Sequence, residues 1–526
     1  MKPLQLKEWL HRAGIGRGSA ILLIVVGMQT LALPPLQAAP TKKEITDSGI
    51  TAAVEKELRL EKGVSPDLID VSTSQGIATL SGSAANLLAK ERAVRIAESI
   101  RGVRGVIDRI TVMPVSRPDE DIRKDILTAL KQDPATKSYQ VAVSIQDAVA
   151  TLSGSVGSYP EKQLAARIAK GVKGVKEVRN DVTINYQAKR TDAEIAADVK
   201  SRLQWDIWIN GGLINPVVKD GKVTLTGTIG SVISKRRAFD DAWINGVTSV
   251  DDSGLKIEPA AGNGARRKFK DAVSSDSEIK QAVQAALSLD PRVSAYSPDV
   301  TVEGGVVILG GSVGNLKAKS AAAQDAKDVV GVSLVDNFLK VRPQQRPTDK
   351  EMETQLKAAL LWDPLLESST IDVGVINRVA YLSGAVDSSL EKAEAQDVAS
   401  RTKGVLLVRN HLKVEPESSI SYYDWPYYSY YGWPYYYHGS PYYGSERFGP
   451  QPYLSDEQIK KNIEDAFFWS PFVDRDDIKV TLHGGVATLT GTVGTWIGWG
   501  EADKDAHKGG AGAVLNRVKV KKGHWW

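Results

Sequence analysis

Serines and histidines are the residues of this chain whose types could support catalysis or metal binding. Ser81 and Ser153 occupy the same position in a repeated Ala-Thr-Leu-Ser-Gly-Ser string, but neither hydroxyl is accompanied by the base that a nucleophile needs. The six histidines show no metal-ligand spacing. The chain has 0 cysteines, which excludes disulfides, thiolate ligands and a cysteine nucleophile. The sequence therefore predicts no catalytic residue, no metal site and no cofactor, and it favours a protein that is not an enzyme.

The glycine of the repeated string recurs at a regular spacing along the chain. Its six copies follow one another at steps of 72, 73, 84, 73 and 107 residues: Gly82, Gly154, Gly227, Gly311, Gly384 and Gly491. A second glycine follows each of them after 19 or 20 positions. Glycines at a helix start can bring backbone amides close to a phosphate. The interpretation that we favour is structural, because glycine adopts positive φ without steric cost.

The residues around these glycines predict the elements of one repeated unit. In four copies a Ser or Thr, followed three residues later by Glu or Gln, predicts a capped helix start. These cap residues are Thr191, Ser275, Thr348 and Ser455. The pair Asp220-Gly221, set among alternating apolar residues, predicts a tight hairpin turn. An Ala-rich second helix and a last strand complete an α-β-β-α-β unit, with two helices on one face of a three-stranded mixed sheet.

The predicted fold class is therefore α+β, with six such units in tandem. The units are expected at residues 45–114, 118–186, 191–258, 275–342, 347–416 and 455–522. An insert rich in Tyr, Trp and Pro is expected at 417–454, and a signal peptide at 1–38. We expect one leucine of each unit to be buried at equivalent points: Leu80, Leu152, Leu225, Leu309, Leu382 and Leu489.

The repeated unit resembles the BON domain, a family named for osmotically inducible periplasmic proteins and nodulation proteins. One matching signature is the Leu-Ser-Gly-Ser-type turn after the second strand. The other is the ending of the unit, carried by Gly174, Val175, Val178, Asn180, Val182 and Ile184, and again by Gly331, Val332, Val335, Asn337, Leu339 and Val341. The resemblance implies an exported envelope module that binds phospholipid or otherwise engages membranes, without catalytic activity.

The N-terminal residues have the order of a secretory signal peptide. Basic residues precede an apolar stretch from Ile21 to Leu33, and small residues around Ala38 offer a cleavage site. An uncleaved anchor is the alternative, but the stretch is shorter than the ~20 apolar residues that a span needs. We therefore expect a periplasmic protein.

The charge distribution does not predict nucleic-acid binding. The net charge is +4, of which residues 1–38 contribute +3, so the rest of the chain carries only +1. Arg266, Arg267 and Lys268 form a basic cluster between the third and fourth units. This cluster would suit anionic lipid headgroups or a solvated linker.

Aromatic residues are the remaining candidates for contact with a membrane or a partner. The insert at 417–454 holds twelve of the 17 tyrosines together with Trp425 and Trp433, which would suit a membrane surface, a glycan or a simple tether. Four further tryptophans gather near the end of the first helix in the third, fifth and sixth units: Trp205, Trp208, Trp362 and Trp469. These four are expected either to pack half-buried or to form a lipid-inserting or partner-binding edge.

Three functions follow as hypotheses. The first is a non-enzymatic envelope protein that associates with a phospholipid surface or a membrane-bound envelope protein and supports stress tolerance. The second is a structural scaffold of packed repeats. The third is a glycan or peptidoglycan binder that uses the aromatic insert.

Overall fold

The computed structural model describes residues 44–60, 64–133, 135–136, 139–186, 189–258, 275–343, 346–366, 371–386, 389–414, 454–473, 475–494 and 496–520. The predicted signal peptide, the basic cluster at 266–268 and the tryptophans of the predicted insert lie outside the described residues. Contacts group Ile45–Trp526 into one unit. Within it the same order of elements occurs six times, and we number these copies modules 1 to 6.

The first three modules contain the following elements. Module 1 has α1 (Asp47–Leu60), η1 (Pro66–Leu68), β1 (Ile69–Ser74), β2 (Ile77–Ala84), α2 (Leu87–Glu98) and β3 (Gly105–Val112). Module 2 has α3 (Asp119–Gln132), β4 (Gln140–Gln146), β5 (Val149–Val156), α4 (Tyr159–Lys170), β6 (Glu177–Asn180) and β7 (Thr183–Ile184). Module 3 has α5 (Asp192–Trp205), η2 (Gly211–Leu213), β8 (Ile214–Lys219), β9 (Lys222–Ile229), α6 (Val232–Asp241) and β10 (Ser249–Ile257).

The last three modules repeat this order. Module 4 has α8 (Asp276–Leu289), η3 (Ser294–Tyr296), β11 (Asp299–Glu303), β12 (Val306–Gly310), β13 (Ser312–Val313), α9 (Leu316–Lys327), β14 (Leu334–Asn337) and β15 (Lys340–Val341). Module 5 has α10 (Asp349–Trp362), β16 (Ile371–Ile376), β17 (Val379–Val386), α11 (Ser389–Arg401), β18 (Leu407–Asn410) and β19 (Lys413–Val414). Module 6 has α12 (Asp456–Trp469), η5 (Arg475–Asp477), β20 (Ile478–His483), β21 (Val486–Val493), α13 (Trp496–Lys508) and β22 (Ala513–Val520).

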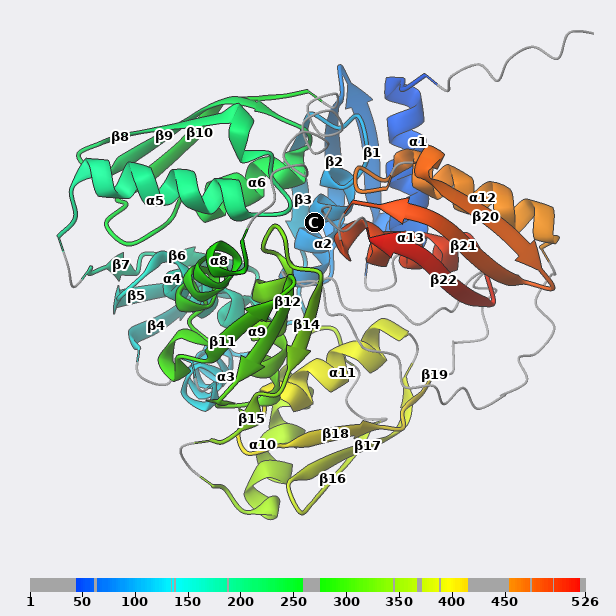
Figure 1. The fold of residues 1–526 in the computed structure, drawn as a ribbon. Coiled ribbons are helices and arrows are strands. Elements are labelled where there is room, and N and C mark those ends of the chain that lie inside the picture. The colour runs from blue at the N-terminus through cyan, green and yellow to red at the C-terminus, as the bar shows by residue number, and fades with distance from the viewer. Residues whose placement is uncertain are drawn as a thin grey trace, which may run out of the picture. The chain divides into compact units, whose positions relative to one another are not determined.

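Each module is a mixed sheet with its helices on one face, as the sequence predicts. In module 3, β9 is the middle strand, paired antiparallel with β8 and parallel with β10, and α5 and α6 lie on the same side of this sheet (Figure 1). Apolar residues of both helices and all three strands form one buried cluster there. The prediction of six equivalent buried leucines is confirmed, because all six have 0% exposure: Leu80, Leu152, Leu225, Leu309, Leu382 and Leu489.

The predicted helix caps are also confirmed. At Thr348 the side-chain oxygen accepts a hydrogen bond from the backbone N–H of Glu351, and the Glu351 carboxylate accepts one from the backbone N–H of Thr348 at 2.8 Å. The same reciprocal bonds form at Thr191, Ser275 and Ser455. These bonds satisfy backbone donors that a helix start otherwise leaves unpaired.

An aspartate at the first position of each first helix binds the turn of the hairpin. In module 5, Asp349 Oδ2 accepts a hydrogen bond from the backbone N–H of Asn377 at 2.7 Å, and Oδ1 accepts one from Arg378 at 3.0 Å. These turn residues have φ of 51° and 65°. Consecutive N–H groups in such a turn point toward the same side and bind an anion. The other modules make the same two bonds through Asp47, Asp119, Asp192, Asp276 and Asp456.

This carboxylate lets the turn sequence vary. The turn of module 4 is Gly304-Gly305, which adopts positive φ freely, whereas Arg378 of module 5 has a Cβ and holds φ of 65°. A non-glycine residue in this conformation costs roughly 1–2 kcal/mol. Two hydrogen bonds to a charged acceptor offset this cost, because such bonds contribute about 1.5–3 kcal/mol each.

The glycine of the repeated string lies where the middle strand crosses the start of the first strand. Gly82 has φ of 112°, and a Cβ built on it would lie 2.1 Å from the carbonyl oxygen of Leu68. Gly154 has φ of 116°, with the corresponding distance to the Gln140 carbonyl being 2.0 Å. Any side chain at these two positions would therefore force the two strands apart.

We expect Asp349→Asn to lower the free energy of unfolding by about 1.5–3 kcal/mol, because an amide cannot accept both turn hydrogen bonds. Asp276→Asn, at a Gly-Gly turn, should lower the free energy of unfolding by a similar amount, because the same two hydrogen bonds are weakened and any turn strain is present in parent and variant alike. Denaturant unfolding of the full chain, followed by circular dichroism, measures both. Asp372→Asn, at an exposed strand position, is the control. A loss below about 1 kcal/mol in both variants would show that the carboxylate does not stabilise the turn.

Candidate functional site

Three pairs of modules share one backbone contact, and these junctions are the most extensive candidate site of the described chain. In each pair, the carbonyl of the last residue of one first helix accepts a hydrogen bond from another module. The donor is the backbone N–H of the residue before that module's second repeated glycine. The three bonds are Trp205–Val330 at 2.9 Å between modules 3 and 4, Trp362–Lys173 at 2.7 Å between modules 5 and 2, and Trp469–Arg101 at 2.8 Å between modules 6 and 1.

The pairing follows a difference between the copies. The last residue of the first helix is tryptophan in modules 3, 5 and 6, whereas modules 1, 2 and 4 have Leu60, Gln132 and Leu289 there. Each of the three bonds joins a module with tryptophan at this position to one without it. The pairs are also nested along the chain, because module 3 pairs with 4, module 2 with 5 and module 1 with 6.

The tryptophan side chains pack into these junctions. Trp469 is 9% exposed and belongs to the apolar core of module 1. A Cβ on Gly49 of module 1 would lie 3.1 Å from the Trp469 ring, so the small residue there makes room for it. Trp205 is half-buried and packs against the core of module 4, and Trp362 is half-buried. Trp469 and Trp205 therefore each lose part of their apolar surface to the packing of two modules.

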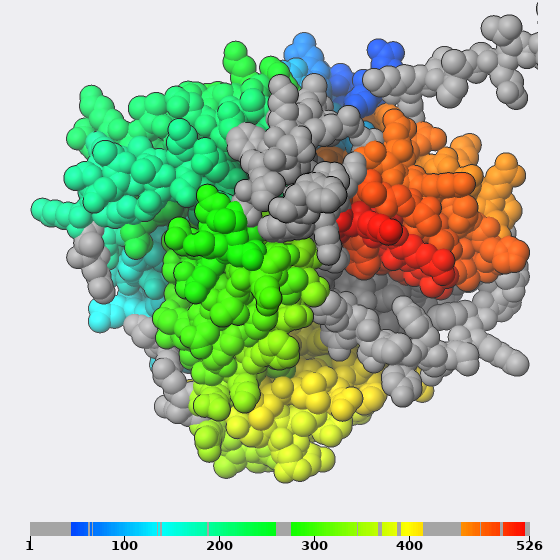
Figure 2. Space-filling view, in the orientation of Figure 1, coloured from blue at the N-terminus to red at the C-terminus, as the bar shows by residue number. Residues whose placement is uncertain are grey.

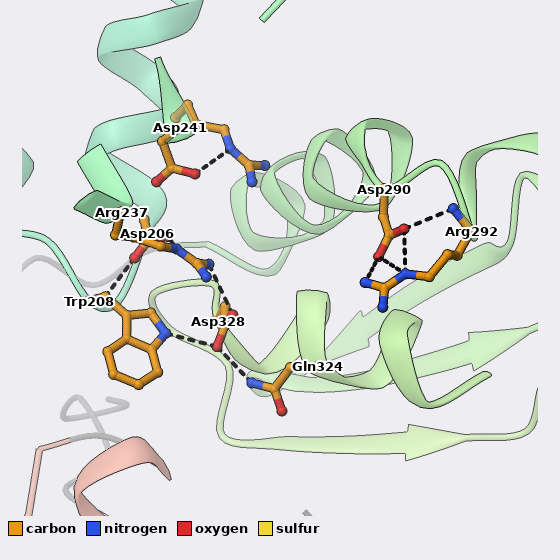
Figure 3. A network of polar contacts seen from close by, with 9 residues as sticks. Asp206, Trp208, Arg237, Asp241, Asp290, Arg292, Gln324 and Asp328 are labelled. Atoms are coloured by element: carbon orange, nitrogen blue, oxygen red, sulfur yellow. Dashed lines mark hydrogen bonds and ion pairs between the residues drawn. The ribbon is translucent and has the colours of Figure 1, made fainter. Parts of the chain in front are cut away.

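A polar network reinforces the junction between modules 3 and 4 (Figure 3). The guanidinium group of Arg237, on α6, donates from Nε to Asp206 Oδ2 at 2.6 Å and from an Nη atom to Asp328 Oδ2 at 3.0 Å. Asp328 Oδ1 accepts from Trp208 Nε1 at 3.1 Å and from Gln324 Nε2 at 2.7 Å. One arginine of module 3 thus forms ion pairs with a carboxylate of each module.

Burial sets the protonation of this network. Burial alone would lower the pKa of Arg237, but the carboxylates of Asp206, Asp328 and Asp241 hold it well above its usual value. Burial, and then the charge of Asp206, raise the pKa of Asp241, although Arg202 Nε donates to Asp241 Oδ1 at 3.0 Å. Arg237 is therefore charged at every physiological pH, whereas Asp241 takes up a proton well above the usual pH for an aspartate.

The junction between modules 1 and 6 uses different polar contacts. The guanidinium group of Arg101 donates to the carbonyls of Ser470 at 2.7 Å and Val473 at 2.8 Å. Lys508 of module 6 forms an ion pair with Glu57 of module 1. Burial would raise the pKa of Glu57, but Lys508 lowers it below its usual value. The backbone contact is therefore shared among the pairs, and the charged contacts differ.

Ion pairs also connect modules of different pairs. Lys317 of module 4 lies 2.5 Å from Asp397 of module 5, and these modules, green and yellow, adjoin in Figure 2. Lys170 of module 2 lies 2.5 Å from Glu91 of module 1. Arg236 of module 3 pairs with Glu98 of module 1. All of these side chains belong to second helices, so second helices make these ion pairs between modules of different pairs.

The structure brings together some of the predicted site residues and not others. Trp208 is 6% exposed and meets Phe472 of module 6 edge to face, with ring centroids 5.0 Å apart. The predicted contact of Trp205, Trp208, Trp362 and Trp469 with a membrane stays a prediction, and it would require these junctions to open. Trp425, Trp433, Arg266, Arg267 and Lys268 lie outside the described residues.

Sequence reasoning missed two of the residues that hold the modules together. An aspartate equivalent to Asp349 recurs in all six copies, directly after the predicted cap in four of them, so the repeat itself carried a signal that could have found it. Arg237 had no such signal, because its partner Asp328 comes from another module.

Two kinds of site are absent from the described residues. No group of three or more His, Cys, Asp or Glu side chains in this part of the chain is arranged to hold a metal ion. None of the described helices combines the length and the apolarity that crossing a membrane requires.

Comparison with known proteins identifies the repeated unit. The family model "BON domain" matches residues 46–114, 118–186, 191–259, 275–343, 348–416 and 455–522. The chain is 34% identical over 143 residues to Osmotically-inducible protein Y of Escherichia coli (strain K12), which covers 26% of this chain and 71% of that protein. It is 32% identical over 162 residues to Outer membrane lipoprotein DolP of Haemophilus influenzae, which covers 30% of this chain and 72% of that protein.

Among solved structures, the chain is similar to CdsD, a structural protein of the type III secretion system of Chlamydia trachomatis. The identity is 16% and the TM-score 0.11, over 38% of this chain and 88% of that chain. A TM-score this low supports no conclusion about the arrangement of the modules.

We expect Trp469→Ala to destabilise the junction between modules 1 and 6 by about 3–5 kcal/mol, the usual cost of truncating a buried tryptophan. The first unfolding transition in denaturant should move accordingly. Phe338→Ala is the matched control, because Phe338 is 65% exposed. A loss below about 1 kcal/mol at Trp469 would show that the tryptophan does not hold the pair together.

We expect the free energy of unfolding to fall as pH rises from about 5 to 8. Asp241 has a raised pKa in the folded state, so the folded chain binds more protons than the unfolded chain in this range, and stability decreases with pH. Asp241→Asn removes this titration while keeping an oxygen for Arg202. Denaturant unfolding at a series of pH values should give a shallower slope for the variant, and an equal or steeper slope would contradict the assignment.

Proposed function

The chain belongs to the BON domain family, and from this membership we propose that it is an exported, non-enzymatic envelope protein that associates with phospholipid or a membrane-bound partner. The observation that carries the proposal is the family itself, present six times in one chain. One relative is named for osmotic induction and the other is named as an outer membrane lipoprotein. The name of the second relative supports a place in the cell envelope, and the name of the first supports a role in osmotic stress tolerance.

The absence of a shared reactive group supports a non-enzymatic role. The position of Ser81 in the repeated string is occupied by Thr226 in module 3, Gly310 in module 4 and Thr490 in module 6. A polar residue that all six copies do share is the aspartate of the hairpin turn, and both of its oxygens are occupied by backbone N–H groups. The repeated features therefore serve the fold of each module.

An apolar strip on module 5 supports shallow contact with a membrane. Val379 of the middle strand pairs with Ile376 on one side and Leu407 on the other, so the three side chains lie in one row across the sheet. Ile376 is 61% exposed and Leu407 is 42% exposed. Tyr381 lies two residues along the same strand and is 39% exposed. Burying apolar area contributes about 25 cal/mol per Å².

The residues beyond the described part of the chain extend this proposal. The basic cluster Arg266, Arg267 and Lys268 would add attraction to anionic headgroups of about 1 kcal/mol per residue. Trp425 and Trp433, with the tyrosines of 417–454, have the composition of a membrane-interface or glycan-binding segment. The chain beyond residue 38 carries a net charge of only +1, so long-range attraction has to come from such local clusters.

Vesicle sedimentation of the chain lacking residues 1–38, with phosphatidylglycerol and phosphatidylethanolamine vesicles, tests the proposal. We expect binding to persist in part at 1 M salt, because charges are then screened over about 3 Å and apolar burial is not. Ile376→Ser with Leu407→Ser should weaken binding at least fivefold, and deletion of 422–443 should weaken it further. Val217→Ser is the control, because Val217 is 54% exposed on module 3.

The same assay separates the alternative functions. No binding to either vesicle would contradict the membrane proposal and favour the scaffold of packed repeats. Binding to peptidoglycan that depends on 422–443 would favour the glycan binder. Binding that salt alone abolishes, with the apolar variants unchanged, would leave an electrostatic contact or a protein partner.

A further inference from the structure

A cleft of about 660 Å³ lies where the second helices of modules 1, 2 and 3 meet the end of α8 in module 4. This volume falls within the range of small-molecule sites. Equivalent positions of the three second helices line it, occupied by Arg95 on α2, Arg167 on α4 and Asp240 on α6. Since the cleft is made by several modules, no single module contains it.

Arg167 is a positive charge that no described carboxylate binds directly; the charges of Glu91 and Asp290 reach it without a hydrogen bond or salt bridge. Its side chain is exposed to the cleft and makes no hydrogen bond or ion pair with any described residue. Burial, followed by the guanidinium groups of Arg292 and Arg95, lowers the pKa of Arg167 to about 10. Those two neighbours already have partners, because Arg292 Nε lies 2.9 Å from Asp290 Oδ1 and Arg95 lies 3.6 Å from Glu91. An anionic group entering the cleft would therefore meet Arg167 first.

Asp240 is the matching negative charge. Its side chain is also exposed and has no hydrogen bond or ion pair with a described residue. Burial raises the pKa of Asp240, and the charges of Arg237, Arg236 and Arg167 oppose this rise. Arg237 and Arg236 are bound to other carboxylates. Five other carboxylates of the cleft have a cationic partner: Glu91, Glu98, Asp108, Asp241 and Asp290. The remaining one, Asp325, is buried, and burial raises its pKa, whereas Asp240 is exposed to the cleft.

Aromatic side chains lie beside Asp240. Tyr159 and Trp243 stack with ring centroids 4.1 Å apart and 6° between their planes, and Phe239 meets both rings edge-on. Burial and then the charge of Asp240 raise the pKa of Tyr159 to about 12, which places the carboxylate near this ring. Aromatic rings attract alkylammonium groups, most strongly where water is excluded.

We propose that this cleft binds a small zwitterion, with Arg167 holding its carboxylate or phosphate group and Asp240 and the aromatic side chains holding its ammonium group. A simple anion would leave Asp240 unpaired, and a simple cation would leave Arg167 unpaired. A zwitterion satisfies both without adding net charge. Phosphocholine has this chemistry, and it exists both as a free solute and as a lipid headgroup.

Calorimetric titration of the chain lacking residues 1–38 with phosphocholine tests the site. We expect Arg167→Gln and Asp240→Asn each to weaken binding about tenfold or more, the usual worth of one hydrogen bond to a charged group. Inorganic phosphate alone and choline alone should each bind at least tenfold more weakly than phosphocholine. Arg123→Gln is the matched control, because Arg123 pairs only with Glu120 on an exposed helix face and should bind like the parent. Circular dichroism confirms that each variant is folded.

Unchanged affinity in either cleft variant, or phosphate binding as tightly as phosphocholine, would overturn the proposal. Competition by phosphatidylcholine vesicles would assign the site to a lipid headgroup, and its absence would assign it to a free solute; both results uphold a zwitterion site. Association with phosphatidylglycerol vesicles should be the same for Arg167→Gln and the parent. The two assays therefore test the zwitterion site and the membrane contact separately, and either proposal can be contradicted while the other stands.

Discussion

The bond between the first residue of each first helix and the hairpin turn is the interaction on which the rest of each module depends. The Asp349 carboxylate binds the N–H groups of Asn377 and Arg378, which lie 28 and 29 residues later in the sequence. It thereby joins the first helix to the hairpin. Each first helix has 14 residues. With its start anchored on the sheet, its last residue lies roughly 20 Å away at a defined point. The carbonyl of that last residue makes the contact with the partner module.

Pairing of distant modules distinguishes this chain from a simple array of repeats. In most repeat proteins each unit contacts its sequence neighbours, and stability is close to a sum of neighbour terms. Here module 1 packs against module 6 through Trp469, and module 2 against module 5 through Trp362. The ion pairs differ from one junction to the next. Pairing with the wrong module would leave buried charges without partners, which is strongly destabilising. These contacts therefore favour one set of pairs over the alternatives.

The same packing leaves two kinds of surface available for function. Among the described residues, the sheet of module 5 exposes the row from Ile376 to Leu407. The second helices face inward among the modules and enclose the cleft that contains Arg167 and Asp240. The apolar row belongs to one module, whereas the cleft exists only when several modules are assembled. Contact with a large surface and binding of a small ligand are thus physically separate properties of this protein.

The sequence by itself determined the module: its six copies, its order of elements, its caps at residues such as Thr348, and the buried leucines such as Leu80. Each of these depends on hydrogen bonds and apolar periodicity within about 70 residues, so local spacing is enough to predict them. The tryptophans at the ends of the first helices were visible as a pattern, but their surroundings were not. Only the tertiary structure decided that Trp469 packs on module 1, because the Arg101 guanidinium group and the Ser470 carbonyl that meet there are 369 residues apart. The position of a charge such as Arg167 beside Asp240 likewise follows from how whole modules pack, which no periodicity within one module encodes.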